Sequence, residues 1–473
     1  MRSIVRALAL GAVFVLVAPA VPPALAAPPV PAGEASLATG GDTAPLAVAP
    51  IRFAQRTLPN GLRVVLAEDH RTPTVAIDVG YDVGGKSDPP GRSGFAHLFE
   101  HLMFKGTSNT RPESWDRLTE DVGGSNNAYT SYDITNYYET VPANHLERLL
   151  WAEADRMANL TVDEANFVTE RKVVIGEYDQ RVLASPYGMV FQLLNQAYAV
   201  HPYRRGVIGD PEQLDAASLA DVRAFHTAFY RPDDAVLVIA GDFDPAQANA
   251  WVDRYFGPLR KPAAAIPRVT AVEPAQTQAR RVRYTSKSAP LPGVLIAYHV
   301  PPARAADTAV LSIVDALLAN GASARLRTAL VDRDRVASQV AVLSDERQQP
   351  GLFALWAIAN AGKTPRDLEP ALLAQVARLR DEPVPADELD KAKTLAVSDL
   401  VRSRQTHDNL AQALVRAAVI DGDPAAVNRD ADAYGRVTAA DVQRVARAYL
   451  TGPNSTTVEY DTAATAAAPG APK

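Results

Sequence analysis

Two histidines spaced four residues apart are the first feature of this sequence that could do chemistry. His97 and His101 lie in the segment Gly94–Phe104. In a helix, residues four apart share one face, so both imidazoles would point to a common position. Imidazole nitrogens bind Zn²⁺ at about 2.0–2.1 Å, and Glu100 would lie close enough to reach a water molecule beside the ion. The order His-x-x-Glu-His is the inverse of the His-Glu-x-x-His zinc signature.

The alternative interpretation is an ordinary amphipathic helix in which neither histidine binds a metal. The apolar neighbours of the histidines would bury one side of the helix and keep a site there dry; these are Leu98, Phe99, Leu102 and Phe104. A third ligand is needed to decide between the two interpretations.

The composition limits both the size of the domains and the chemistry of the site. The chain has 473 residues, a net charge of −6, no basic stripe and no cysteine. A chain of this length is too long for one hydrophobic core, so we expect at least two domains. The negative net charge does not indicate a nucleic-acid partner. Because cysteine is absent, disulfides are excluded and a metal would need nitrogen and oxygen ligands.

The first 26 residues have the pattern of a secretory signal peptide. Arg2 and Arg6 precede an apolar run from Ala7 to Val17, and Ala24-Leu25-Ala26 is a small-residue cleavage pattern. The apolar run is too short to span a bilayer comfortably, so we expect cleavage near Ala26 and no membrane span in the mature chain. An uncleaved anchor is the alternative. Cleavage would place the protein outside the cytoplasm, in a bacterium most simply in the periplasm.

Composition shifts divide the rest of the chain. Residues 27–50 and 463–473 are rich in Ala, Pro and Gly and predict a flexible leader and a disordered tail. Between them we expect an N-terminal domain at 51–261 and a C-terminal domain at 275–462. A proline-containing linker at 262–274 would join them.

Four segments have the pattern of strands. Leu62–Glu68 and Thr74–Tyr81 predict a pair of neighbouring strands, since Val75, Ile77 and Val79 alternate with smaller or polar residues. Residues 126–138 are aromatic and β-prone, and we interpret them as one strand. It is either a plain sheet strand or an edge that pairs with an extended peptide. Ala235–Gly241 is the last strand predicted in the first half.

Two helices follow the β-prone segment. The first is expected from His145 to about Leu160. The order Thr161-Val162-Asp163-Glu164 resembles a capping box and predicts the start of the second near Val162, with the helix running towards Arg181. Glu170 and Glu177 are seven residues apart and would lie on one face of that helix.

The second half resembles a diverged copy of the first. Leu219–Phe229 matches Thr438–Tyr449 in pattern, and an offset of 224 aligns Asp163-Glu164 with Asp387-Glu388.

At that offset Glu170 falls on Thr394 and Glu177 on Val401. The copy therefore lost both carboxylates, and Val401 indicates apolar packing where no ligand is needed. We expect the whole chemical site to lie in the first half.

Several motifs in one order resemble the pitrilysin-like or insulinase-like zinc peptidases, the metallopeptidases with the inverted motif. The resemblance extends from about Ile51 to Tyr460. It rests on His97–His101, Asn127–Ser131, Glu170–Glu177, His201–Tyr203, Tyr230–Pro232 and Gly241-Asp242. It implies an α+β fold of two similar α/β units from an internal duplication, each an antiparallel sheet with packed helices, enclosing a chamber.

The resemblance also implies the roles of the site residues. Zn²⁺ would be held by His97, His101 and Glu177, with a fourth position open to water. Glu100 would act as the general base, and Glu170 would orient a ligand by a hydrogen bond. Four residues would bind the substrate peptide by backbone pairing: Asn127, Ala128, Tyr129 and Thr130.

One departure from the family affects the expected assembly. Many relatives have an Arg and a Tyr in the second half that hold the substrate backbone or the developing oxyanion. Val331 and Ser338 stand at those positions, although Arg333 or Arg335 could substitute. We therefore expect the catalytic subunit of a two-subunit zinc endopeptidase, with a homologous partner supplying the Arg and Tyr. The alternatives are a homodimer, a catalytically silent assembly subunit, or a zinc-binding protein of the same fold.

Overall fold

The computed structural model describes residues 48–112 and 114–463. The predicted signal peptide, residues 27–47 of the predicted leader and residues 464–473 of the predicted tail lie outside these ranges. Within the described ranges, no helix is both long enough and apolar enough to cross a membrane.

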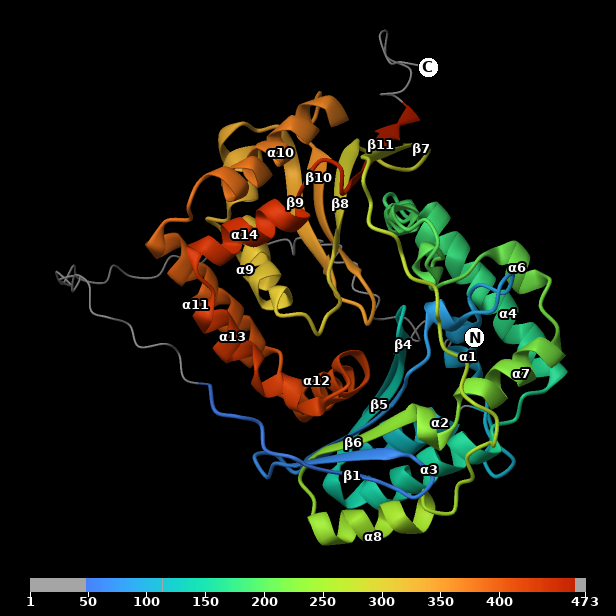
Figure 1. The fold of residues 1–473 in the computed structure, drawn as a ribbon. Coiled ribbons are helices and arrows are strands. Elements are labelled where there is room, and N and C mark those ends of the chain that lie inside the picture. The colour runs from blue at the N-terminus through green and yellow to red at the C-terminus, as the bar shows by residue number, and fades with distance from the viewer. Residues whose placement is uncertain (1–47, 113, 464–473) are drawn as a thin grey trace, which may run out of the picture.

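Two sheets organise the fold, one in each half of the chain (Figure 1). The first has six strands and the second has five. In spatial order the first sheet contains β1 (Ala54–Thr57), β2 (Arg63–Glu68), β6 (Ala235–Gly241), β3 (Thr74–Tyr81), β5 (Thr135–Pro142) and β4 (Ser125–Thr130). The second contains β7 (Arg280–Ser286), β11 (Ser455–Thr462), β8 (Gly293–Val300), β10 (Gly351–Ala359) and β9 (Ala337–Asp345).

Helices connect and cover these strands. In the first half they are α1 (Phe95–Leu102), α2 (Ser114–Thr119), α3 (Leu146–Asn159), α4 (Glu164–Tyr178), α5 (Met189–Leu194), α6 (Pro211–Asp215), α7 (Leu219–Phe229) and α8 (Pro245–Tyr255). In the second half they are α9 (Asp307–Ala319), α10 (Pro365–Asp381), α11 (Ala386–Arg402), α12 (His407–Arg416), α13 (Asp430–Arg436) and α14 (Ala439–Tyr449).

The two sheets have the same connectivity. β2 pairs in parallel with β6, as β7 does with β11. The next strand pairs antiparallel in both sheets, β3 with β6 and β8 with β11. β5 and β4 complete the first sheet as β10 and β9 complete the second, while β1 has no counterpart among the described strands. The α9 helix, between β8 and β9, takes the place of α1, between β3 and β4. The predicted α+β fold of two similar units is therefore confirmed.

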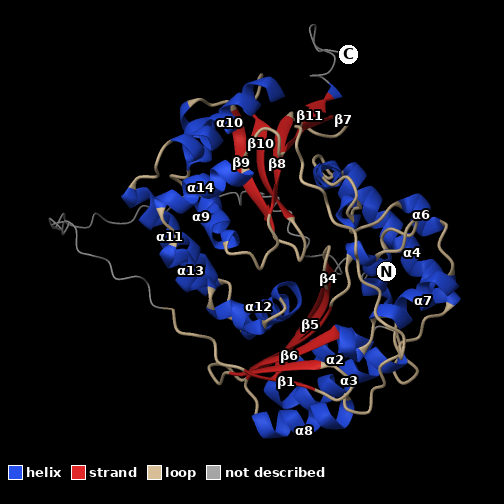
Figure 2. Ribbon diagram, viewed as in Figure 1, coloured by secondary structure: helices blue, strands red, loops and turns tan. Residues whose placement is uncertain are grey.

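Each sheet buries one face under helices of its own half. Val64 and Leu66 of β2 and Ile77 of β3 point into a core with α1, α3, α7 and α8. In the second half, β8 and β10 pack in the same way against α9, α10 and α14. Figure 2 shows each set of strands as one layer covered by helices. Because side chains alternate along a strand, the residues between these positions point to the opposite face.

That opposite face is covered by a helix from the other half. Val65 and Val236 of the first sheet pack against Leu410 and Leu414 of α12. Figure 1 shows α12 beside β5 and β6, at the end of the row of second-half helices that includes α11 and α13. In return, α5 of the first half packs on the second sheet through Val190, Leu193 and Leu194. The predicted boundary at 262–274 divides the sequence, whereas the apolar packing crosses it.

Two strand predictions are wrong in part. Leu62–Glu68 and Thr74–Tyr81 correspond to β2 and β3, but they are not neighbours, because β6 lies between them and pairs with both. All residues of β6 are buried, which suits a central strand. Residues 126–138 form two strands, β4 and β5. A turn closed by the hydrogen bond from Ser131 N to Ile134 O, at 2.8 Å, separates them.

Two expectations about the helices also need correction. The second predicted helix begins at Glu164, two residues after Val162. Asp163 is its N-cap and accepts a hydrogen bond from Asn166 N at 2.8 Å, so an aspartate takes the role expected of Thr161. Val401 is 40% exposed, so apolar packing does not explain why the copy has valine there.

The segment between the halves is held against the first half. Arg231 donates hydrogen bonds to two carbonyl groups of residues 262–264, at 2.6 and 2.8 Å. Glu273 accepts hydrogen bonds from three successive backbone N–H groups, those of residues 199–201, at 2.6, 3.0 and 2.8 Å. These contacts fix the path of the chain into the second sheet.

A buried polar cluster ties the loop between β9 and β10 to the first half. The Asp133 carboxylate lies 2.9 Å from Lys86 Nζ and accepts hydrogen bonds from the Tyr203 hydroxyl at 2.6 Å and Gln348 N at 3.1 Å. The Arg347 guanidinium, 1% exposed, lies 4.5 Å from the centre of the Tyr203 ring. The relative position of the two sheets therefore depends on buried charges as well as on the exchanged helices.

Candidate metal centre

The orientation of α1 is fixed at its N-terminus. Gly94 precedes the helix with a φ of +95°. A Cβ at this position would lie 2.8 Å from the Cα of Gly209, so the close approach of the two chains requires glycine. The Asp88 carboxylate accepts hydrogen bonds from the backbone N–H groups of Gly94, at 2.6 Å, and Ala96, at 2.9 Å. It thus satisfies donors that a helix start leaves unpaired.

The α4 helix lies against α1 and presents both glutamates to it. Phe167, Glu170, Val174 and Glu177 are its buried residues, at spacings of three and four that define one helical face. Glu170 is 3% exposed and Glu177 is 6% exposed. The apolar members of this face join the first core, and so hold the carboxylates beside the histidines.

His97, His101 and Glu177 come together in one cluster. One potential ligand atom from each lies within 4.8 Å of the others, and no other group of His, Asp or Glu among the described residues meets this condition. His97 Nε2 lies 3.6 Å from Glu177 Oε2, and His101 Nε2 lies 3.8 Å from Glu177 Oε1. The imidazole rings are perpendicular, with centroids 5.0 Å apart.

This geometry fits a tetrahedral zinc ion. Two ligand atoms at about 2.0–2.1 Å from a tetrahedral ion are about 3.3 Å apart, a few tenths of an ångström less than the nitrogen–oxygen distances here. Glu177 Oε2 is buried and has no hydrogen-bond partner among the described residues. A cation between these three side chains would satisfy that oxygen.

Glu170 contacts both His101 and Lys105. Its Oε2 lies 3.3 Å from His101 Nδ1, and its Oε1 lies 2.9 Å from Lys105 Nζ. A proton on Nδ1, donated to this carboxylate, leaves the lone pair of Nε2 directed at the cluster. Burial favours a raised pKa for Glu170, but the hydrogen bonds from His101 and Lys105 outweigh it and lower the pKa.

The two histidines differ in their electrostatic environment. Burial, together with the positive charges of His101 and Arg181, lowers the pKa of His97 well below its usual value. Burial also acts to lower the pKa of His101, but the hydrogen bond with Glu170 and the nearby carboxylates raise it. The excess negative charge around His101 favours a cation at this position.

Glu100 lies on α1 between the two histidines and outside the set of ligands. Its Oε2 accepts a hydrogen bond of 2.6 Å from the Thr130 hydroxyl. Burial raises the pKa of Glu100, while the charge of His101 and the hydrogen bond from Thr130 oppose the rise. A carboxyl group whose pKa is raised by burial is better able to accept and release a proton near neutral pH.

The predicted substrate strand is β4, which is the last strand of the first sheet and therefore lies at its edge. The strand contacts α1 and so passes beside the cluster. Ala128 is 5% exposed and points into the first core, and Tyr129 packs beside α12. Asn127 Oδ1 accepts a hydrogen bond from Ala128 N at 2.8 Å, and Thr130 is bonded to Glu100. Peptide pairing along this edge stays a prediction.

The second half presents no polar pair in place of the missing Arg and Tyr. Val331 packs against the second core. The Ser338 hydroxyl donates to two backbone carbonyls of β10, at 3.1 and 3.3 Å. Arg333 forms an ion pair of 2.7 Å with its neighbour Asp334, and Arg335 is exposed. Within the described residues, no hydrogen bond or ion pair joins any of these side chains to the histidine cluster.

Two residues that support the site were not predicted. Lys105 follows His101 by four residues and pairs with Glu170, so the spacing on α1 could have indicated it. Asp88 precedes Gly94 by six residues and lies outside the usual capping position, so no local pattern points to it.

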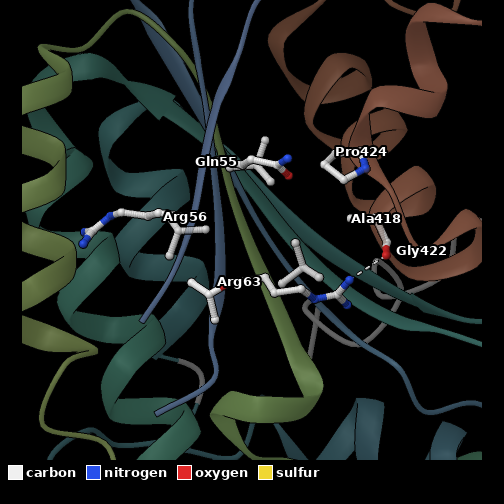
Figure 3. A pocket seen from close by; sticks show the side chains of 10 residues that line it. Gln55, Arg56, Arg63, Ala418, Gly422 and Pro424 are labelled. Atoms are coloured by element: carbon white, nitrogen blue, oxygen red, sulfur yellow. Dashed lines mark hydrogen bonds between the residues drawn. The ribbon is translucent and has the colours of Figure 1, made fainter. Parts of the chain in front are cut away.

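A cavity of about 310 Å³ lies elsewhere, between β1, β2 and residues 418–424 (Figure 3). Arg63 extends across it and donates a hydrogen bond of 2.7 Å to the Ala418 carbonyl. Arg56 points away and pairs with Asp253 at 2.7 Å. No residue of the histidine cluster lines this cavity, so we do not assign the chemistry to it.

Comparison with known proteins identifies the family. The model described as "Insulinase (Peptidase family M16)" matches residues 63–210, and "Peptidase M16 inactive domain" matches residues 216–395. The chain is 31% identical to the zinc protease PqqE of Helicobacter pylori over 405 residues, 85% of this chain and 91% of that protein. The chain belongs to the insulinase family, peptidase family M16. The insulinase match, residues 63–210, includes all three residues of the histidine cluster.

Other M16 relatives are named as subunits. The chain is 25% identical to the probable mitochondrial-processing peptidase subunit beta of Arabidopsis thaliana, over 83% of this chain and 75% of that protein. It is 27% identical to human cytochrome b-c1 complex subunit 1, over 55% of this chain and 54% of that protein. Membership of the M16 family therefore supports a peptidase but does not by itself separate a catalytic subunit from a silent one.

Solved structures have the same fold. A protease from Helicobacter pylori superposes with a TM-score of 0.85 at 30% identity, over 87% of this chain and 100% of that chain. The periplasmic protease PqqL from Escherichia coli matches with a TM-score of 0.73 at 20% identity, over 90% of this chain and 50% of that chain.

Proposed function

We propose that this M16 chain is a zinc-dependent endopeptidase that cleaves peptides or small unfolded proteins. One observation carries the proposal: His97, His101 and Glu177 place three potential ligand atoms within 4.8 Å of one another, with Glu100 on the same helix as both histidines. Bound Zn²⁺ would act as a Lewis acid and lower the pKa of water to about 7. The named zinc protease among the relatives supports this choice of metal.

The protein groups around the cluster have separate roles in this proposal. Glu100 takes the proton of the attacking water and passes it to the leaving amine. The Thr130 hydroxyl holds the Glu100 carboxylate in position, and Glu170 holds the His101 tautomer. The peptide pairs through its backbone with the outer edge of β4, and this pairing has no side-chain preference of its own.

The oxyanion requires a further donor, and we propose that a homologous chain supplies it. Val331 and Ser338 cannot act as the Arg and Tyr that many relatives have at these positions. One relative is named as the beta subunit of a processing peptidase, which supports pairing with a second chain. A heterodimer in which this chain provides the metal site is therefore our proposed assembly.

A catalytically silent subunit is the second candidate. The missing Arg and Tyr favour it, as does the likeness to a subunit of the cytochrome b-c1 complex. The complete set of ligands, together with Glu100, argues against it. Zinc content and cleavage of a generic peptide by the purified assembly separate the two candidates.

We also propose a periplasmic location and the domain limits given by the sequence. The signal-like residues 1–26 support export, and a solved structure of the same fold is described as a periplasmic protease. Residues 51–261 form the proposed metal-binding domain and residues 275–462 its homologue without a metal site, joined by 262–274.

The substitution Glu100→Gln tests the peptidase. It preserves the size of the side chain and its hydrogen bond with Thr130 but removes the proton acceptor. The variant should bind one Zn²⁺ per chain, as the wild type should, while its turnover falls by about 10²–10⁴-fold. Metal analysis and a fluorogenic peptide assay on the same preparation measure both quantities. Turnover at the wild-type rate would refute the role of Glu100.

Mixing experiments test the second subunit. The chain alone should bind zinc but cleave slowly, because the loss of one oxyanion donor costs about 10²–10³-fold in other enzymes. Adding a homologous chain that has the Arg and Tyr should restore cleavage, and sedimentation should show the complex. Fast turnover by the pure chain, as monomer or homodimer, would refute this part of the proposal.

A further inference from the structure

Arg181 is a cationic side chain near the metal cluster that the proposed mechanism does not use. It follows Glu177 by four residues, in the π-helical segment η4 (Asp179–Ala184) that continues α4. Residues four apart in a continuing helix lie nearly above one another, so Arg181 is one turn beyond the proposed ligand on the same face. Single π-helical turns within helices are frequent at functional sites.

The backbone of Arg181 is held firmly although its side chain is exposed. Val182, the next residue, is 5% exposed and anchors the turn. The chain then returns over this turn at Gly188, where a Cβ would lie 2.0 Å from the Arg181 carbonyl oxygen. No side chain could be added there without displacing η4. The start of the Arg181 side chain is thus fixed relative to Glu177.

The guanidinium of Arg181 is available to a ligand. The structure has no hydrogen bond or ion pair from it to any described residue, whereas Arg402, near the end of the equivalent helix α11, pairs with Asp399. The positive charge of Arg181 acts on His97 and on Glu100. Glu100 is hydrogen-bonded to Thr130 of β4, so the charge of Arg181 acts on a group that contacts the strand proposed to hold the peptide.

We propose that Arg181 binds an acidic side chain of the substrate next to the scissile bond, so that the chain selects peptides with Asp or Glu at that position. The guanidinium has a planar set of donors that matches a carboxylate. The edge of β4 pairs with backbone alone, and Arg181 would add the side-chain preference that this pairing lacks. The inference rests on the proposed peptidase function, because it requires a peptide on β4.

Peptide binding in the Glu100→Gln background tests the inference without cleavage. Fluorescent peptides of one sequence, with Glu, Gln or Lys scanned through the positions flanking the scissile bond, are titrated into the zinc-loaded variant. The Glu peptide should bind about tenfold or more tightly than the Lys peptide at one position, since Arg181 would form charge-assisted hydrogen bonds with Glu and would repel Lys. Adding Arg181→Glu should reverse the preference. The matched control Arg402→Glu should leave it unchanged.

Kinetics on the active protein separate selectivity from catalysis. Arg181→Gln should raise KM for the Glu peptide about tenfold and leave kcat and the Lys peptide nearly unchanged. An equal fall in kcat for all peptides would overturn the proposal, and so would charge-independent binding in the Glu100→Gln background, although the peptidase would stand. Charge-selective binding with no cleavage of any peptide would refute the peptidase and leave the role of Arg181 intact.

Discussion

The contact between Glu170 and His101 makes a quantitative prediction about metal affinity. Glu170→Gln changes little in size, but an amide has one acceptor where the carboxylate has two. In the structure both oxygens are used, Oε2 by His101 Nδ1 at 3.3 Å and Oε1 by Lys105 Nζ at 2.9 Å. The amide group must therefore direct its NH₂ at one of two donors.

The size of the effect follows from these contacts. If the NH₂ group faces His101, the Nδ1 proton loses its acceptor and the tautomer that directs Nε2 at the cluster is no longer favoured. If it faces Lys105, His101 keeps an acceptor but the ammonium group loses its own. In both orientations the negative charge beside the cluster is lost. A buried polar group left unpaired costs about 1–3 kcal/mol. Removing a partner that orients a metal ligand typically weakens binding 10–100-fold, about 1.4–2.8 kcal/mol. We therefore expect the Kd for Zn²⁺ to rise 10–100-fold.

Competition against a chromophoric zinc chelator measures this Kd directly. Glu164→Gln is the matched control, because Glu164 is exposed in the first turn of the same helix and has no contact with the cluster. Thermal unfolding without metal checks that Glu170→Gln remains folded. A folded Glu170→Gln variant that binds Zn²⁺ with the wild-type Kd would show that Glu170 does not orient His101.

Three further predictions concern the metal and the fold. Chelation of zinc should abolish peptide cleavage but leave far-ultraviolet circular dichroism unchanged, because the helices have their own apolar packing; activity that survives complete metal removal would contradict the assignment. Gly94→Ala should reduce the free energy of unfolding by about 1–3 kcal/mol, more than Gly123→Ala, which has positive φ but open space around it. Asp133→Asn should reduce the free energy of unfolding, measured by urea denaturation, by about 1–3 kcal/mol, because it leaves the buried Lys86 ammonium with only the more distant carboxylate of Asp82, at 3.5 Å; an unchanged free energy of unfolding would refute that role.

The sequence alone predicted the parts of the site that depend on local periodicity. The spacing of His97 and His101 places them on one face of any helix, and the same argument places Glu170 and Glu177 on one face of another. The internal copy and the limits of β6 were also readable, because apolar patterns repeat along the chain. These features need only a few turns of backbone.

Tertiary structure decided which of these elements meet. Strand order depends on pairing between distant segments, so β6 could take its place between β2 and β3 against the local expectation. The hydrogen bond from Thr130 to Glu100 exists only because β4 folds beside α1. The exchange of α5 and α12 arises because each sheet has two apolar faces and its own half covers one of them. A local pattern shows that a face is apolar, but the packing of the whole chain determines what covers it.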